Sequence, residues 1–266
     1  MGIPDAPHSV ITGAGGGFGR ALALLLAGRG SRLTLSDVNL QAVEETAQLA
    51  GSAGAKGVRA LRCDVTKIED VEALAAAAEP PIDLVVNNAG VSSGGRIGEL
   101  PLKDWRWTID VDLFGVIHGC HVFVPMLRAQ GRGHVLNVGS AAGLLAAPHM
   151  GAYNVAKAGV VALSETLSGE LVGSGIGCTV LCPTFFQTDI ARSGRFTDEK
   201  TRARAEALVA KGKTADGIAR YALEACRRDA LYAIPMADGR WMWRFKRASP
   251  VGFRNIAGRV AKRMFP

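Results

Sequence analysis

Two residues near the middle of the chain, Tyr153 and Lys157, have the types and the spacing of a proton-transfer pair. Residues four apart on a helix project from the same side, so both side chains can act on one substrate. The ordinary pKa of tyrosine, about 10, is too high for a base at neutral pH, but a nearby ammonium stabilises the phenolate. The pair therefore predicts a tyrosine that works as a general acid or base.

Ser140 is placed to join this pair. It follows an apolar run at 134–138 that predicts a strand, and it precedes Tyr153 in a loop with almost no charge. Tyr153 and Lys157 alone carry little information, whereas the three residues together form a pattern that chance does not readily produce.

The uncharged stretch 133–156 is long enough to raise the question of a membrane span, but Gly, Ser, Asn, His and Pro interrupt it too often.

A glycine-rich turn lies near the start of the chain, between a predicted strand at 8–12 and a predicted helix at 18–27. Glycines let backbone amides approach a pyrophosphate, and the following helix offers its positive N-terminal end to the anion. This context favours a dinucleotide site over an ordinary flexible loop. The residues expected to bind the cofactor here are Gly13, Gly15, Gly17, Phe18 and Gly19.

Asp37 follows the second predicted strand, at 32–36, and indicates which dinucleotide is bound. A carboxylate at this point accepts hydrogen bonds from the adenosine ribose and repels a 2′-phosphate. Neither Gly16 nor Val38 is basic, so the usual means of holding NADP is missing and NAD is expected. The alternative role for Asp37 is that of a cap on the next helix.

Strands and helices alternate along the rest of the chain. The predicted strands span 8–12, 32–36, 58–62, 82–86, 134–138, 177–181 and 231–234. The predicted helices span 18–27, 40–50, 68–78, 102–129, 152–171, 197–209 and 215–227. This alternation predicts an α/β fold, a doubly wound parallel sheet (Rossmann fold) of about seven strands, with ligands at the carboxyl ends of the strands. One domain is expected over 1–238, with a substrate-loop region at about 184–212 and a C-terminal tail at 239–266.

In these motifs and their order, the chain resembles the short-chain dehydrogenase/reductase family over roughly residues 8–235. The matching stretches are TGAGGGFG at 12–19, Asp37, Asp64-Val65, NNAG at 87–90, Ser140, YNVAK at 153–157 and Pro183 to Thr188. The resemblance implies an oxidoreductase that passes hydride between nicotinamide and a carbinol carbon.

The resemblance also implies roles for individual residues. Tyr153 is the general acid/base, Lys157 tunes it and binds the nicotinamide ribose, and Ser140 holds the substrate oxygen. The further cofactor contacts that it implies are Asp64 and Val65 at the adenine, Asn88, Ala89 and Gly90 along the cleft, and Pro183 and Thr188 at the nicotinamide, with Tyr153 and Lys157.

The chain departs from the family pattern at two positions. Asp112 stands where the family has an asparagine that anchors a water leading to the lysine, and we expect Asp112 to keep this water as a catalytic residue. A charged Asp112 would favour the ammonium of Lys157 but oppose the phenolate of Tyr153. Thr184 stands where the family commonly has glycine, so the nicotinamide loop is expected to be set differently.

Composition excludes several classes of protein. The five cysteines show no metal-binding or disulfide spacing, so free buried thiols and no metal site are expected. The N-terminus lacks the basic flank and apolar stretch of a signal peptide, which predicts a cytoplasmic protein. The resemblance to the family further implies that apolar residues surround the substrate mouth, which favours a hydrophobic alcohol or ketone such as a steroid, terpenoid, lipid or aromatic carbinol. These residues are Leu144, Leu145, Met150, Phe185 and Phe186, with His149 nearby, whereas His118 and His121 are expected to have a structural or surface role.

Positive charge is concentrated in the tail, although the whole chain carries only +7. Eight basic residues and no acidic residue follow position 239: Arg240, Arg244, Lys246, Arg247, Arg254, Arg259, Lys262 and Arg263. Aromatic residues lie among them, so the tail is expected either to rest on an anionic membrane or to pack at a subunit interface. Nucleic acid is not expected as a partner, because no recognised binding module accompanies the charge.

Two other functions remain open from the sequence. One is a catalytically weak NAD-binding regulator or scaffold of the same fold, which Asp112 and Thr184 keep in consideration. The other is epimerase or dehydratase chemistry on nucleotide sugars, which ordinarily needs a larger C-terminal domain. The resemblance also implies a homo-oligomer, a dimer or tetramer, that pairs helices near 102–129 and 152–171.

Overall fold

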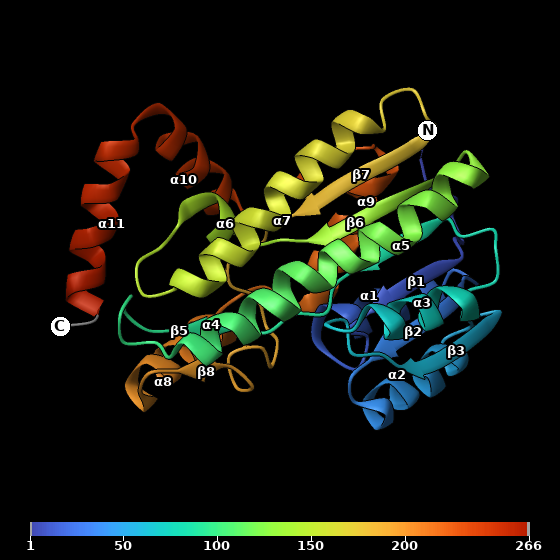
Figure 1. Ribbon diagram of the computed structural model, residues 1–266, viewed down its shortest axis with the longest axis horizontal. Coiled ribbons are helices and arrows are strands. Elements are labelled where there is room, and N and C mark those ends of the chain that lie inside the picture. The colour runs from blue at the N-terminus through green and yellow to red at the C-terminus, as the bar shows by residue number, and fades with distance from the viewer. Residues whose placement is uncertain (1, 265–266) are drawn as a thin grey trace.

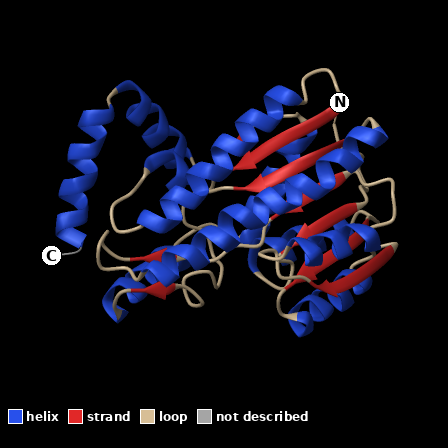
Figure 2. Cartoon of the chain, in the orientation of Figure 1, coloured by secondary structure: helices blue, strands red, loops and turns tan. Residues whose placement is uncertain are grey.

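The computed structural model describes residues 2–264, with the backbone alone at position 264. Its centre is a parallel sheet of seven strands in the order β3-β2-β1-β4-β6-β7-β9 (Figures 1 and 2). The strands are β1 (Ser9–Thr12), β2 (Arg32–Asp37), β3 (Gly57–Arg62), β4 (Leu84–Asn87), β6 (Gly133–Val138), β7 (Ile176–Leu181) and β9 (Tyr232–Ala233). The predicted doubly wound sheet is confirmed.

Helices cover both faces of the sheet. One face carries α3 (Ile68–Ala77), α5 (Gly115–Gln130) and α7 (Gly151–Glu170), and the other carries α1 (Gly17–Ala27), α2 (Leu40–Ser52) and α9 (Ala215–Arg227). Successive residues of a strand point to opposite faces, so Val10 joins the first core and Ile11 the second. Burial on both faces explains why these strands are continuous apolar runs.

The helix at 102–130 is continuous but irregular. It consists of α4 (Leu102–Ile109), a π-helical turn (Asp110–Phe114) and α5. It is long and apolar enough to cross a membrane, with a mean hydropathy of 1.3 over its most apolar window. In this fold α5 packs against β4, β6 and α3, as a sheet-covering helix does.

Smaller elements gather at the carboxyl ends of the strands. A two-stranded sheet joins β5 (Ser93–Gly94) to β8 (Arg195–Phe196), and α8 (Glu199–Ala210) follows β8. Helix α6 (Ala141–Leu145) comes directly after Ser140. The sequence predicted none of β5, β8 and α6, because each is too short to show a periodic pattern.

The last residues form two helices, α10 (Ala237–Ala248) and α11 (Pro250–Met264). The boundary expected between residues 238 and 239 therefore falls inside α10. Trp243 packs against the core and its ring centroid lies 5.0 Å from that of Tyr232. Lys246 donates a hydrogen bond of 2.8 Å to the carbonyl oxygen of Leu144. The first of the two helices is thus packed onto the domain that precedes it.

Candidate active site

The glycine-rich turn meets the NNAG segment where the strand order reverses, between β1 and β4. Thr12 Oγ1 accepts hydrogen bonds from the backbone N–H groups of Asn88 (3.0 Å) and Ala89 (3.1 Å). The side-chain amide of Asn88 donates to the carbonyl oxygens of Thr12 (2.8 Å) and Gly13 (2.9 Å). Crevices at such reversal points bind ligands in open α/β sheets, and here both walls are locked together.

The turn has a backbone that only glycines adopt easily, and it has room for a phosphate. Gly13 and Gly17 have positive φ values of 65° and 51°. A Cβ at Gly13 would lie 2.6 Å from the Cα of Ala89, whereas a Cβ at Gly16 would meet nothing within 4 Å. Helix α1 begins after Gly16 with no capping side chain and no acidic residue in its first turn. Its N–H groups are therefore available, and the site fits a dinucleotide pyrophosphate.

Two other predicted residues of the turn, Phe18 and Gly19, have packing roles. Phe18 is buried in the core, and a side chain at Gly19 would collide with the carbonyl of Gly13. Arg20, which the sequence did not single out, donates a hydrogen bond of 2.7 Å to the carbonyl oxygen of Gly15. It also forms an ion pair with Glu45 on α2. No local spacing relates Arg20 to Glu45, so the sequence alone could not predict these contacts of Arg20.

Asp37 lies against the turn at the end of β2. Its Oδ2 accepts a hydrogen bond from the backbone N–H of Gly15 (2.9 Å), and its Oδ1 accepts one from Asn39 (3.0 Å). Asn39 is the residue that caps α2, through a hydrogen bond from Ala42. The alternative role of Asp37 as a helix cap is therefore wrong, and its carboxylate lies against the glycine-rich turn.

Asp64 and Val65 lie beyond the end of β3. Asp64 Oδ1 accepts hydrogen bonds from both the backbone N–H and the hydroxyl of Thr66. The carbonyl oxygen of Val65 lies 2.8 Å from Nδ1 of His118. His118 thus holds this loop from α5, in keeping with the structural role expected for it, and His121 is exposed.

Ser140, Tyr153 and Lys157 come together at the end of β6. Lys157 Nζ is buried, donates a hydrogen bond of 3.0 Å to the carbonyl oxygen of Val138, and lies 5.7 Å from the centre of the Tyr153 ring. Ser140 caps α6, because its Oγ accepts a hydrogen bond from the N–H of Ala142. The Ser140 side chain also hydrogen-bonds with that of Tyr153. The spacing in the sequence predicted this grouping.

Asp112 enters the same group from the π-helical turn. Its Oδ1 accepts a hydrogen bond of 2.7 Å from the N–H of Val91, and its Oδ2 lies 3.7 Å from Lys157 Nζ. The carboxyl group is completely buried, and burial raises its pKa to about 6 although the ammonium of Lys157 opposes the rise. A Cβ at Gly90 would lie 3.1 Å from Asp112 Oδ1, so glycine leaves room for the pair.

The pKa of Tyr153 is raised in the chain alone. Burial is the main cause and the charge of Asp112 is the second, while the hydrogen bond with Ser140 acts in the opposite direction. The sequence left open whether the indirect effect of Asp112, through the charge of Lys157, or its direct opposition to the phenolate prevails. In this geometry the phenolate is opposed, so a positive charge added beside the ring would be needed to favour it.

The loop after β7 closes over the turn. Pro183 accepts a hydrogen bond of 2.8 Å from the N–H of Ala141, and the side chain of Thr188 would lie 3.5 Å from a Cβ at Gly17. Thr184 is not among the described residues with positive φ. Its methyl group would lie 3.0 Å from a Cβ at Gly239 in α10. The residue that replaces the family's glycine is thus packed against the C-terminal helix.

The residues expected at the substrate mouth divide into two groups. Leu144 and Leu145 are buried in the core, and Phe186 packs against the core on the other face of the sheet. Phe185 is exposed and Met150 is half-buried, so these two apolar side chains remain accessible. Phe186 is also half-buried, so the lining of the mouth by these five residues stays a prediction.

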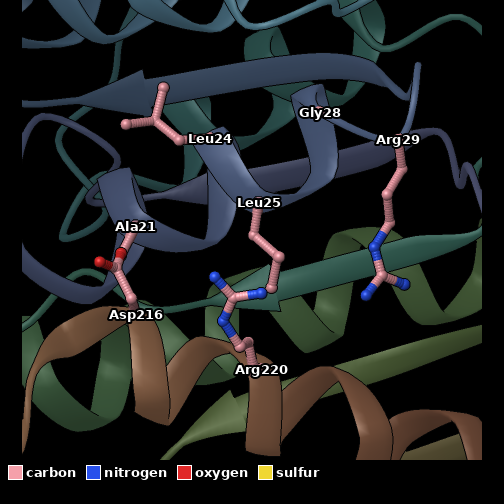
Figure 3. A pocket seen from close by; sticks show the side chains of 7 residues that line it. All are labelled: Ala21, Leu24, Leu25, Gly28, Arg29, Asp216 and Arg220. Carbon is pink, nitrogen blue, oxygen red and sulfur yellow. The ribbon is translucent and has the colours of Figure 1, made fainter.

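A pocket of about 430 Å³ lies between α1 and α9 (Figure 3). It is lined by Ala21, Leu24, Leu25, Gly28, Arg29, Asp216 and Arg220, none of which was predicted for the site.

All five cysteines are buried and unpaired, as expected. Among the described residues, no group of three or more His, Cys, Asp or Glu is arranged to hold a metal ion.

Comparison with known proteins agrees with this geometry. The family model for short chain dehydrogenase matches residues 7–199. The "CLA biosynthesis dehydrogenase/reductase" of Lactiplantibacillus plantarum is 32% identical over 246 residues, which is 84% of this chain and 86% of that protein. The "2-(R)-hydroxypropyl-CoM dehydrogenase" of Xanthobacter autotrophicus is 33% identical over 190 residues, or 69% of this chain and 76% of that protein.

Two solved structures show the same fold with different cofactors. A short chain dehydrogenase/reductase of Burkholderia phymatum in complex with NAD has a TM-score of 0.87 and 36% identity, covering 93% of this chain and 95% of that chain. A short-chain dehydrogenase of Sphingobium yanoikuyae in complex with NADPH has a TM-score of 0.78 and 26% identity, covering 94% and 95%. The chain is an oxidoreductase and belongs to the short-chain dehydrogenase family.

Proposed function

We propose that this protein is an NAD-dependent dehydrogenase that interconverts a hydrophobic secondary alcohol and its ketone. The observation that carries the proposal is the grouping of Ser140, Tyr153 and Lys157 at the end of β6, beside the glycine-rich turn. A tyrosine within reach of both a serine hydroxyl and a buried ammonium is suited to proton exchange with a bound alcohol.

The residues of the chain have distinct tasks in this reaction. Ser140 Oγ holds the substrate oxygen, and Tyr153 Oη takes the hydroxyl proton during oxidation or returns it during reduction. Lys157, held by the carbonyl of Val138, presents its charge to Tyr153 and its N–H groups to the nicotinamide ribose. NAD, when bound, supplies the hydride acceptor and a positive ring that favours the phenolate. Asp112 is placed to hold a water between itself and Lys157, since 3.7 Å is long for a direct hydrogen bond.

The choice of NAD rests on Asp37. Its carboxylate lies at the turn with no basic side chain at Gly16 or Val38 to receive a 2′-phosphate. The solved relatives bind either NAD or NADPH, so the local charge is the argument that favours NAD for this chain.

The substrate class rests on the accessible apolar side chains. Phe185 and Met150 lie on the segments that follow β7 and precede α7, and residues 182–188 and 146–152 include no Asp, Glu, Lys or Arg. A hydrophobic carbinol is therefore favoured over an acid or a sugar.

Two further proposals concern assembly and location. Phe114 and Val155 are exposed apolar side chains on the segments 102–129 and 152–171, which supports a homo-oligomer, a dimer or tetramer, through these helices. We also propose a cytoplasmic protein whose residues 239–266 make peripheral contact with a membrane.

The test is an assay of the purified protein with NAD or NADP and a panel of hydrophobic secondary alcohols, following the absorbance of the reduced nicotinamide. We expect turnover with NAD and apolar carbinols, and little with NADP. The absence of turnover with every alcohol, despite measurable NAD binding, would contradict the proposal and favour a regulatory protein. Equal turnover with NADP would contradict the role given to Asp37.

A further inference from the structure

Helices α10 and α11 form a hairpin at the end of the molecule toward which the strands point (Figure 1). Its inner side is fixed by Trp243 and Phe253, which pack against the core, and by a hydrogen bond from Lys246 to Leu144. Leu144 belongs to α6, the helix that Ser140 caps. The hairpin is therefore anchored to the catalytic loop.

Apart from these core contacts, the hairpin exposes large apolar groups. Trp241 is 66% exposed, Ile256 52% and Val260 47%. The Trp241 ring stacks on that of Phe245 with centroids 5.4 Å apart, and Phe245 in turn contacts Phe253 of α11. Trp241 is thus held in place by the packing, although most of its surface is open.

Positive charge borders these apolar groups. Arg259 and Arg263 lie one turn on from Ile256 and Val260, so the four side chains share one side of α11. Within the described part of the chain, none of the eight basic residues from 240 to 263 forms an ion pair with a carboxylate. The same stretch contains no acidic residue. This face therefore suits a negatively charged partner, and like charges oppose its pairing with the same face of a second copy.

We propose that the exposed surface of α10–α11 binds the surface of an anionic phospholipid bilayer. Trp241, Ile256 and Val260 enter the boundary between headgroups and acyl chains, while Arg259 and Arg263 meet the phosphates. A nucleic acid would match the charge but would leave the apolar side chains without a partner. Because the hairpin is anchored to α6, docking would bring the carboxyl ends of the strands to the membrane. Delivery of a lipophilic substrate by this route rests on the proposed function, whereas membrane binding itself does not.

Cosedimentation of the full chain with vesicles tests the proposal without any substrate. We expect binding to mixed phosphatidylglycerol and phosphatidylcholine vesicles, little binding to phosphatidylcholine alone, and release as salt is added. The double variant Arg259→Gln/Arg263→Gln should weaken binding at least about tenfold, because each basic residue near an anionic surface contributes appreciably. The variant Trp241→Ala should weaken it at unchanged charge.

The matched control removes the same charge elsewhere. Arg29 and Arg220 are exposed beside the pocket between α1 and α9 (Figure 3), and Arg29→Gln/Arg220→Gln should bind vesicles as the natural chain does. Equal loss in both double variants, or no preference for anionic vesicles, would overturn the proposal. A changed sedimentation coefficient of Arg259→Gln/Arg263→Gln with unchanged vesicle binding would also overturn the proposal. It would identify a second copy of the chain as the partner of this surface. Circular dichroism checks that each variant is folded.

Discussion

At the scale of single residues, the surroundings of Asp112 have opposing effects on its pKa. Burial disfavours its charge, whereas Lys157 and the N–H of Val91 favour it, and the balance leaves its pKa at about 6. Above that pH the carboxylate is mostly ionised, and its charge raises the pKa of Tyr153. This arrangement makes the phenolate of Tyr153 harder to form.

Replacement of Asp112 by asparagine should therefore shift the pH profile of alcohol oxidation toward lower pH. The change removes a negative charge that opposes the phenolate, while the amide keeps the acceptor for Val91 and a site for water. Oxidation at neutral pH should rise by less than about a hundredfold, since the charge of Asp112 is only the second cause of the raised pKa of Tyr153 and should account for less than about two pKa units. Initial rates of Asp112→Asn across pH test this. A profile that stays in place, or a rise beyond that limit, would contradict the account of Asp112.

Asp37 and Val38 provide the second prediction at this scale. The double variant Asp37→Asn/Val38→Arg keeps a hydrogen-bond acceptor for the Gly15 N–H, removes the negative charge and adds a positive one. The preference for NAD over NADP should fall by roughly a hundredfold, because placing like charges together costs several kcal/mol. Comparison of kcat/KM for the two cofactors measures it, and an unchanged ratio would show that cofactor choice lies elsewhere.

At the scale of elements, the β5–β8 sheet holds in place the segment after β7, which we propose to be the substrate loop. Arg195 in β8 forms an ion pair of 2.9 Å with Asp104, and its guanidinium lies 4.0 Å from the centre of the Trp107 ring. Both partners belong to α4, which leads into the π-helical turn that carries Asp112. The loop after β7 is thus tied to the helix that supplies part of the candidate site.

The variant Arg195→Ala should raise KM for the alcohol several-fold and change kcat and NAD binding little, because it loosens the loop and leaves the catalytic group intact. Cation–π contacts and partly buried ion pairs contribute about 0.5–2 kcal/mol, which sets this scale. Arg192 is the control, since its ion pair with Asp189 is exposed on both sides. Steady-state kinetics that showed equal effects for Arg192→Ala and Arg195→Ala would argue against a specific role for the sheet.

The sequence predicted the elements whose pattern is local. The strands of the main sheet are apolar runs, and one helix is enough to bring Tyr153 beside Lys157. The π-helical turn leaves no such pattern, so the distance between Asp112 and Lys157 could not be foreseen. Strands β5 and β8 have two residues each and depend on pairing between Ser93 and Arg195, far apart in the chain. The composition of the tail predicted its charge, whereas its helices depend on packing by residues such as Trp243.

At the scale of the whole molecule, helix α10 contributes to the stability of the domain. Trp243 packs against the core and Tyr232, whereas Trp241, two residues earlier, is largely exposed. Trp243→Ala should lower the free energy of unfolding by about 2–3 kcal/mol, somewhat below the loss seen for a fully buried tryptophan. Trp241→Ala should lower it by less than about 0.5 kcal/mol. Urea denaturation of the two variants measures both changes, and equal losses would mean that α10 does not pack as described.

The central claim is that this short-chain dehydrogenase oxidises a hydrophobic alcohol with Tyr153 as its acid/base. The most direct measurement is turnover and NAD affinity of Tyr153→Phe, with the alcohol on which the natural chain is most active. The claim predicts a loss of turnover of about a thousandfold, in the range of general acid–base catalysis, with NAD affinity changed by less than about threefold. A variant that keeps more than about a tenth of the turnover would contradict the claim.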